Sequence, residues 1–442
     1  MPQLQKKLTL YGLTMIAIGS CIGSGIFVTP AKIVAYLPHH GWVLLVWVIG
    51  GLIALTGALT FAELGALFPK AGGVYVFLKE AYGNLVGFLY GWVILLVINT
   101  GALAALSLAF ADYMTFFLPN IGQTGKLALA IGTIAILTLV NLIGVNISQL
   151  LSNTFTGLKL LAILAIIGLG LYFYEPTELS LELSLSKDPP DQLVSHLLLA
   201  LIGVLFSFGG WHHASYLAGE AVDAPRTVPK AMVLGAVVVT VTYLLVNIAY
   251  MLLLPLESIA GTEHVAGDAV GSVIHYGGQI VSVAIAISIF GTIGIYTMSA
   301  PRIYFAMARD GIFFPQLARL HPRYRTPVWA MLVQGGWSIV LLLFWGTFHD
   351  LITYVTFADV AFMMLGGISV LVFRAKRPHA ERSYKVWGYP LVPLVFIGIS
   401  AAFVLNTLWQ EPLHALVALG VLCLGIPVYI WFERKGRGHK KT

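Results

Sequence analysis

The stretch "IGSCIGSGIFVTP", residues 18–30, decides the fold because it places a weak point inside a long apolar run. It holds three glycines and two serines where an ordinary membrane helix carries bulky apolar residues. Glycine costs a helix interior up to about 1 kcal/mol relative to alanine. A backbone group loosened inside a bilayer must find a new partner or lose several kcal/mol. The stretch is therefore either a close-packing surface or a deliberate break.

Composition indicates the class of protein. The chain has 442 residues, of which 58% are hydrophobic and 10% charged, and apolar runs long enough to cross a bilayer recur from end to end. We expect an all-α polytopic membrane protein that forms a single transmembrane domain over residues 1–442, with twelve transmembrane helices. The expected spans lie near 9–36, 42–68, 84–118, 126–146, 153–174, 196–219, 231–254, 280–308, 327–346, 351–373, 388–409 and 413–432.

The distribution of Lys and Arg predicts the orientation. If the N-terminus is cytoplasmic, 21 of these residues fall on the inside, and only Lys32, Lys126 and Lys187 fall outside. Both termini are therefore expected to be cytoplasmic. The net charge of +6 then reflects topology and contact of the basic tail with anionic lipid. We expect a lipid bilayer as the surroundings and no nucleic acid partner.

Cysteines and short motifs exclude several functions. Cys21 and Cys423 lie in the first and last spans, so no disulfide framework is indicated. The chain has no CxxC, HExxH, GxxxxGK[ST], GxSxG or GxGxxG string. We therefore expect no enzyme activity, no metal site and no cofactor. A secondary transporter, a channel and a receptor-like protein remain.

A second weak point lies in the sixth span. This span reads "HLLLALIGVLFSFGGWHHASYLAGE", and its Ser-Phe-Gly-Gly sequence predicts a break at residues 207–210. Transporters built from inverted repeats carry such breaks in matching segments of both halves. We expect repeats near 9–174 and 196–373, with additional helices near 388–432. Helices 1 and 6 would be discontinuous and face each other at the midplane.

The chemistry of two facing breaks suits one kind of ligand. A half-helix that begins near Ser24 presents unpaired N–H groups and a positive dipole end, which favour a carboxylate. Carbonyls freed at Cys21, Ile22, Phe206 and Ser207 can accept hydrogen bonds from an ammonium group. An α-amino acid carries both charges on one carbon.

Four segments carry a family resemblance. They are "GSGIFVTP" (23–30), "AELGALFPKAGGVYVFLKEAYG" (62–83), "LFSFGGW" (205–211) and "GEAVDAPRTVPKAM" (219–232). Together they resemble the amino acid/polyamine/organocation (APC) superfamily, and most closely its L-type amino acid transporter branch with the bacterial relatives. The resemblance implies a LeuT-like 5+5 inverted repeat and sodium-independent exchange of neutral L-amino acids. A proton-coupled symporter and a transporter of cationic amino acids or polyamines, both of the same fold, remain alternatives.

The resemblance also implies roles for individual residues. Ser24, Gly25 and Ile26 would donate backbone N–H groups to the substrate carboxylate. Phe206 would close over the substrate from outside, and Gly209 would leave room for its side chain.

Other polar residues have two interpretations each. His212 either lines the pocket or packs between helices. Tyr296 and Thr297 lie in a polar patch that could face the substrate. Lys159 either snorkels to the headgroups or, as the resemblance implies, replaces a sodium ion by bonding to carbonyls of the broken first helix. Asp359 either serves a cationic substrate or a proton relay, or bonds to a neighbouring hydroxyl group.

The loop between the third and fourth spans bears on partners. Animal L-type transporters are joined to a single-span glycoprotein through a cysteine in this loop, and "LPNIGQTGK" (118–126) has none. The resemblance thus implies a protein without a disulfide-linked heavy chain, in a bacterial inner membrane.

Overall fold

The computed structural model describes residues 4–115, 117–118, 120–174, 185, 192–262, 264–344, 348–410 and 412–439. Regular structure in these ranges is helical, apart from one isolated bridge between Leu8 and Ala221. Most of the predicted outer loop after the fifth span, with Lys187, lies outside the described residues, as do Lys440 and Lys441 of the basic tail.

Every expected span position holds a helix. Ten helical segments in the described ranges are long and apolar enough to cross a membrane, and α9 (Leu193–Phe208) and α16 (Val328–Phe344) are shorter apolar helices. The ten comprise α1 (Leu10–Cys21) with α2 (Gly25–Tyr36), α3 (His40–Leu67), α5 (Asn84–Val93) with η1 (Ile94–Ile98) and α6 (Asn99–Met114), α7 (Gly122–Leu142), α8 (Val145–Tyr172), α11 (Ala224–Leu253), α14 (Gly277–Ser299) with α15 (Pro301–Arg309), α17 (Phe348–Lys376), α18 (Leu391–Gln410) and α19 (Pro412–His439). The chain is a multi-pass, all-helical membrane protein.

Shorter helices connect the spans. They are α4 (Val74–Tyr82), α10 (His213–Tyr216), η2 (Ala218–Glu220), α12 (Leu256–Ala260), α13 (Val265–Gly271) and η3 (Pro315–Ala318). The fifth span begins at Val145 rather than near residue 153, because Gly144 provides a left-handed turn at φ 126° directly before the helix. This earlier start places Lys159 in the middle of α8.

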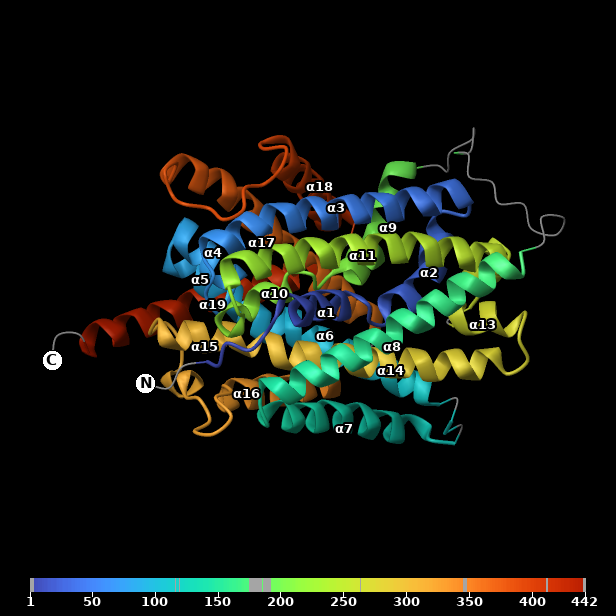
Figure 1. Ribbon diagram of the computed structural model, residues 1–442, viewed down its shortest axis with the longest axis horizontal. Helices are drawn as coiled ribbons and strands as arrows, with labels where there is room; N and C mark the ends of the chain where they lie inside the picture. The colour runs from blue at the N-terminus through green and yellow to red at the C-terminus, as the bar shows by residue number, and fades with distance from the viewer. Residues whose placement is uncertain are drawn as a thin grey trace.

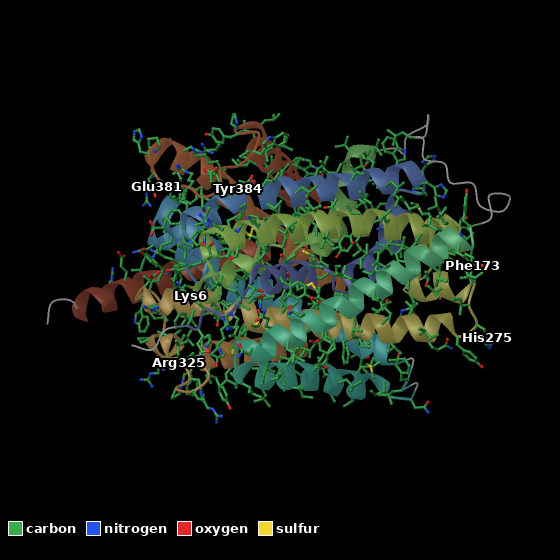
Figure 2. The ribbon with its side chains drawn as sticks, viewed as in Figure 1. Lys6, Phe173, His275, Arg325, Glu381 and Tyr384 are labelled. Carbon is green, nitrogen blue, oxygen red and sulfur yellow. The ribbon has the colours of Figure 1, made fainter. Side chains whose placement is uncertain are left out.

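The long helices lie side by side along the longest axis of the molecule (Figure 1). Helix α1 lies at the centre and packs against α8, α11 and α14. The first described residues and the end of α19 lie at the same end of the bundle, which we call the terminal end. Figure 2 shows Lys6, Arg325, Glu381 and Tyr384 there, and Phe173 and His275 at the opposite, distal end.

A buried carboxylate fastens α17 and the loop that follows it to α3 at the terminal end. Glu63 accepts hydrogen bonds from Arg374 at 2.8 and 2.7 Å and from the Val386 N–H at 2.8 Å. The Nε atom of Arg382 lies 3.0 Å from the same carboxylate. A buried charge is tolerated only when it is paired and hydrogen-bonded, and Glu63 meets both conditions.

A second buried ion pair joins the N-terminal segment, η2 and α15. Arg302 donates to both carboxylate oxygens of Glu220, at 3.0 and 2.8 Å, and also to the Met298 carbonyl. The backbone carbonyl of Glu220 accepts from the N–H groups of Lys7 and Leu8 at 2.8 and 2.9 Å. Three chain segments are thus held together at this point.

We predict that Glu63→Gln lowers thermal stability much more than Glu80→Gln. Breaking the Glu63 pairs leaves two guanidinium groups without a counter-charge, and the loss of one partner of a buried pair costs about 3–5 kcal/mol. The Glu80–Arg377 pair, with 25% and 46% of the two side chains exposed, is the matched control. Exposed pairs are worth about 0–1 kcal/mol. The measurement is the temperature at which the detergent-solubilised protein loses its size-exclusion peak, and equal shifts for the two variants would contradict the prediction.

Candidate functional site

The first span is interrupted at residues 22–24. Helix α1 ends at Cys21 and α2 begins at Gly25. Ser24 is fully buried, and its hydroxyl has no hydrogen-bond partner. Among the described residues, the N–H groups of Ser24, Gly25 and Ile26 donate to no protein acceptor. The start of α2 is therefore an open set of donors at the positive end of a helix dipole.

The sixth span is interrupted at residues 209–212, between α9 and α10. The expected break at 207–210 is corrected by two residues, because Ser207 and Phe208 remain helical. Ser207 packs against α2 and its hydroxyl donates to the Gly203 carbonyl at 2.8 Å. The chain turns only where Gly210 adopts φ 125°, a conformation that favours glycine.

The two interruptions touch each other. The Ser20 hydroxyl oxygen lies 2.7 Å from the carbonyl oxygens of both Gly210 and Ile16, and the Cys21 thiol lies 3.3 Å from the Phe208 carbonyl oxygen. A Cβ atom at Gly25 would lie 2.8 Å from the Ser207 Cα atom. The two spans run in opposite directions, so the end of α1 meets the start of the α9–α10 turn (Figure 1). We call residues 20–25 and 207–210 the joint.

Tyr243 of α11 bridges the two halves of the joint. Its hydroxyl lies 2.9 Å from the carbonyl oxygens of both Cys21 and Ser207. A hydroxyl has one proton, so it donates to one of them at a time. Two of the carbonyls expected to be free therefore share a donor, and a third, that of Phe206, accepts from the Gly209 N–H at 3.2 Å. Sequence reasoning missed Tyr243, whose only signal is a tyrosine within an apolar span.

Lys159 lies on α8 and binds the end of α1 at the interruption. Its side chain is 1% exposed, and its ammonium donates to the carbonyls of Gly19 and Ile22 at 3.0 and 2.7 Å. It also donates to the Thr292 hydroxyl at 2.7 Å. The snorkelling interpretation is wrong, because the ammonium is bound inside the bundle. The contact with the broken first helix is the one that the family resemblance implies.

A hydroxyl group of α14 supports the same carbonyls. The Thr292 Oγ1 atom lies 3.0 Å from the Gly19 oxygen and 2.9 Å from the Ile22 oxygen. The sequence pointed to the same polar patch but to Tyr296 and Thr297. The Thr297 hydroxyl donates instead to Ile293 within its own helix, at 2.7 Å. Thr292 rather than Thr297 contacts these carbonyls because Thr292 lies on the face of α14 that packs against α1.

A cavity of about 40 Å³ lies beside the joint. At roughly 10–15 Å³ for each water, this volume has room for about three waters. Expected site residues that line it are Phe206, Gly209, His212, Tyr296 and Asp359. A neighbouring cavity of about 40 Å³ shares Gly209, His212 and Asp359. The structure thus brings together residues from α9, α14, α17 and the α9–α10 turn.

The other expected site residues lie elsewhere. Cys21, Ile22, Ser24, Gly25 and Ser207 belong to the joint, and Ile26 follows it in α2. None of these six residues lines this cavity. The joint and the cavity meet at Gly209 and Gly210, which contribute to both. A ligand that spans them would contact helix termini at one end and side chains at the other. No group of three or more metal-ligating residues occurs in the described ranges.

An irregular turn in the third span also lines the cavity. The segment η1 has π-helical geometry, and Ile94, Ile98 and the following Asn99 face the cavity. Such turns often occur at functional sites. Its loosened carbonyls are satisfied by the Trp337 indole N–H, 3.1 Å from the Leu96 oxygen, and by the Thr100 hydroxyl. Nothing in the sequence indicated this turn.

Aromatic and hydroxyl groups complete the cavity wall. The Nδ1 atom of His213 lies 2.6 Å from the Ser299 hydroxyl, and its ring centroid is 4.3 Å from that of Tyr296. The hydroxyls of Tyr216 and Tyr90 lie 2.5 Å apart. The His213 and Tyr216 side chains therefore already have hydrogen-bond partners within the protein.

The chain is similar in sequence to one protein family over most of its length and to several known proteins. Residues 8–425 match the family described as "Amino acid permease". The chain is 32% identical to the human Asc-type amino acid transporter 1, over 99% of this chain and 85% of the relative. It is 31% identical to the human large neutral amino acids transporter small subunit 2, over 96% and 80%. It is 30% identical to the serine/threonine exchanger SteT of Bacillus subtilis, over 96% of each chain.

We predict that Gly25→Ala weakens ligand binding at least tenfold. The added methyl group would meet the Ser207 hydroxyl and lie 2.8 Å from the Ser207 Cα atom, so the joint must open. Overpacking of this kind costs about 1–3 kcal/mol. The measurement is equilibrium binding of a labelled L-amino acid that the wild-type protein binds. Gly168→Ala in α8, where nothing lies within 4 Å, is the control. Wild-type affinity in Gly25→Ala would show that the close contact at the joint is not needed.

Proposed function

This chain belongs to the amino acid permease family of the APC superfamily, and we propose that it is a sodium-independent exchanger of neutral L-amino acids. The observation that carries the proposal is the open start of α2, where three N–H groups lack a protein acceptor beside a second helix break. The names of the relatives support the substrate class, since all three are described by the amino acids they transport or exchange.

The joint would bind the α-carboxylate and the α-ammonium, the two groups that all amino acids share. The N–H groups of Ser24, Gly25 and Ile26 hold the α-carboxylate, because they combine free donors with a positive dipole end. The α-ammonium donates to the carbonyl of Cys21 or Ser207, which share the one proton of the Tyr243 hydroxyl, so that one of them keeps a lone pair for a further hydrogen bond. The Ile22 carbonyl, also expected to bind the ammonium, already accepts from Lys159 and lies within reach of the Thr292 and Ser288 hydroxyls. The substrate side chain then points into the cavity next to Gly209.

Selection and closure would depend on the cavity wall. Phe206 on the last turn of α9 closes over the bound substrate, and His212 and Tyr296 contact its side chain. The cavity of about 40 Å³ has room for a few waters only, so the substrate requires the helices to move apart. Entry and release therefore need two arrangements of the same bundle, which is alternating access.

The architecture that we propose is a LeuT-like 5+5 inverted repeat with twelve crossings. The two interrupted spans run in opposite directions and contact each other, as expected for equivalent helices of inverted repeats (Figure 1). Repeat one covers about 9–174 and repeat two about 196–373, and the helices at about 388–432 are additional. The buried Arg302–Glu220 pair joins η2 to α15 at the terminal end.

The ammonium of Lys159 would replace a coupling cation. It donates to the carbonyls of Gly19 and Ile22. A sodium ion at this position would need the same oxygen atoms, so a fixed ammonium makes sodium unnecessary.

Sidedness and partners complete the proposal. Both termini are cytoplasmic, because the basic residues expected inside, such as Lys6 and Arg325, lie at the terminal end (Figure 2). The two cysteines are Cys21, buried in the joint, and Cys423 in α19. A disulfide from the loop between α6 and α7 is therefore impossible, and the protein works without a disulfide-linked heavy chain. A bacterial inner membrane is its proposed location.

Asp359 favours a second candidate function. A carboxylate in the cavity wall suits proton-coupled symport or transport of cationic amino acids or polyamines. Uptake driven by a pH gradient into liposomes that contain no amino acid would favour this alternative over exchange.

We predict that proteoliposomes preloaded with a neutral L-amino acid take up a labelled one, and that empty liposomes do not. Replacement of sodium by choline should leave the rate unchanged. The methyl ester of a good substrate should compete at least about tenfold more weakly than the free acid, because it lacks the charge that the N–H groups hold. Strong sodium dependence, or esters that compete as well as acids, would contradict the proposal.

We predict that Lys159→Met slows exchange at least tenfold and changes substrate affinity less than threefold. The substitution keeps the length of the side chain but removes the donors to Gly19 and Ile22, which shifts the position of α1 rather than the substrate contacts. Lys126→Met, at an exposed pair with Asp112, is the control. Exchange at the wild-type rate would show that this ammonium is not part of the transport cycle.

A further inference from the structure

A carboxylate without a protein partner faces the cavity. Asp359 lies on α17 and lines both cavities beside the α9–α10 turn. Its Oδ1 atom is buried and accepts no hydrogen bond. The ion pairs between described residues do not include Asp359. The hydroxyl of Thr356, one helical turn earlier in the same cavity, also lacks a partner.

Three neighbouring polar side chains already have hydrogen-bond partners within the protein. Tyr216 pairs with Tyr90, His213 pairs with Ser299, and the Asn99 amide donates to the Tyr296 carbonyl at 3.4 Å. A buried carboxylate without a donor costs several kcal/mol. Asp359 and Thr356 are therefore two polar side chains of the cavity wall whose buried oxygen atoms have no hydrogen-bond partner among the described residues.

We propose that Asp359 accepts a hydrogen bond from the side chain of the substrate, and that the protein prefers side chains that carry an O–H or N–H donor over apolar side chains of the same size. This inference rests on the proposed function, because it assigns the side-chain end of the same site: a hydroxyl donor corresponds to exchange of neutral amino acids, and an ammonium donor to the second candidate function. A substrate hydroxyl could donate to Asp359 and accept from Thr356, whereas an ammonium could donate to both.

The test compares pairs of amino acids that differ in one donor group. The competition constants of L-threonine and L-valine, and of L-2,4-diaminobutyrate and L-norvaline, are measured in exchange by the full-length protein. In the wild type, the donor-bearing member of at least one pair should bind about tenfold more tightly, because hydrogen bonds to charged groups are worth about 1.5–3 kcal/mol.

Three variants identify the acceptor. Asp359→Leu should bring the ratio for the preferred pair close to one. Asp359→Asn, which keeps size and one acceptor oxygen, should retain a preference for threonine and lose one for diaminobutyrate. Thr356→Val should lower the threonine-to-valine ratio while it leaves the carboxylate in place. Asp112→Asn, at the exposed distal pair, should change no ratio.

Two results would overturn the inference without affecting the proposed function. One is a wild-type protein that exchanges valine and norvaline as well as their donor-bearing partners. The other is an Asp359→Asn variant that weakens all four amino acids equally, which a purely structural or proton-coupling role would produce. Failure of the wild type to exchange any of the four would instead contradict the proposed function.

Discussion

A helix that is interrupted inside a bilayer must find donors for its loosened carbonyls within the protein, because lipid offers none. Here the carbonyls of Gly19 and Ile22 are satisfied by the Lys159 ammonium and the Thr292 hydroxyl. These donors come from α8 and α14, so both helices must pack against α1. The central position of α1 in the bundle follows from this requirement (Figure 1).

The interruption is asymmetric, and the asymmetry explains its chemistry. The carbonyls at the end of α1 have donors from the protein, whereas the N–H groups at the start of α2 do not. An anionic ligand is therefore the natural complement of the site. Small residues bring the two interrupted spans together, because packing between helices in lipid depends on close contact rather than on the hydrophobic effect. Gly25 against Ser207 and Gly210 against Ser20 are the closest of these contacts at the joint.

Buried charged side chains must also find their partners within the protein. Glu63 and Glu220 are each held by guanidinium groups at the terminal end, where buried pairs join segments that are distant in the chain. Asp359 lies in the cavity wall without such a partner. Glu63 and Glu220 therefore stabilise the bundle, whereas Asp359 is available to a ligand.

The sequence by itself determined the apolar spans, the two interrupted helices and the unusual character of Lys159, because helix breaking by glycine and the cost of a charge in lipid are local properties. It also indicated Phe206, Gly209, His212 and Tyr296, which line one cavity. Only the tertiary structure decided that the sixth span breaks at Gly209 rather than at Ser207, and that Tyr243 and Thr292 supply donors to the joint. These features depend on which helix faces meet, and that is set by packing between spans far apart in the sequence.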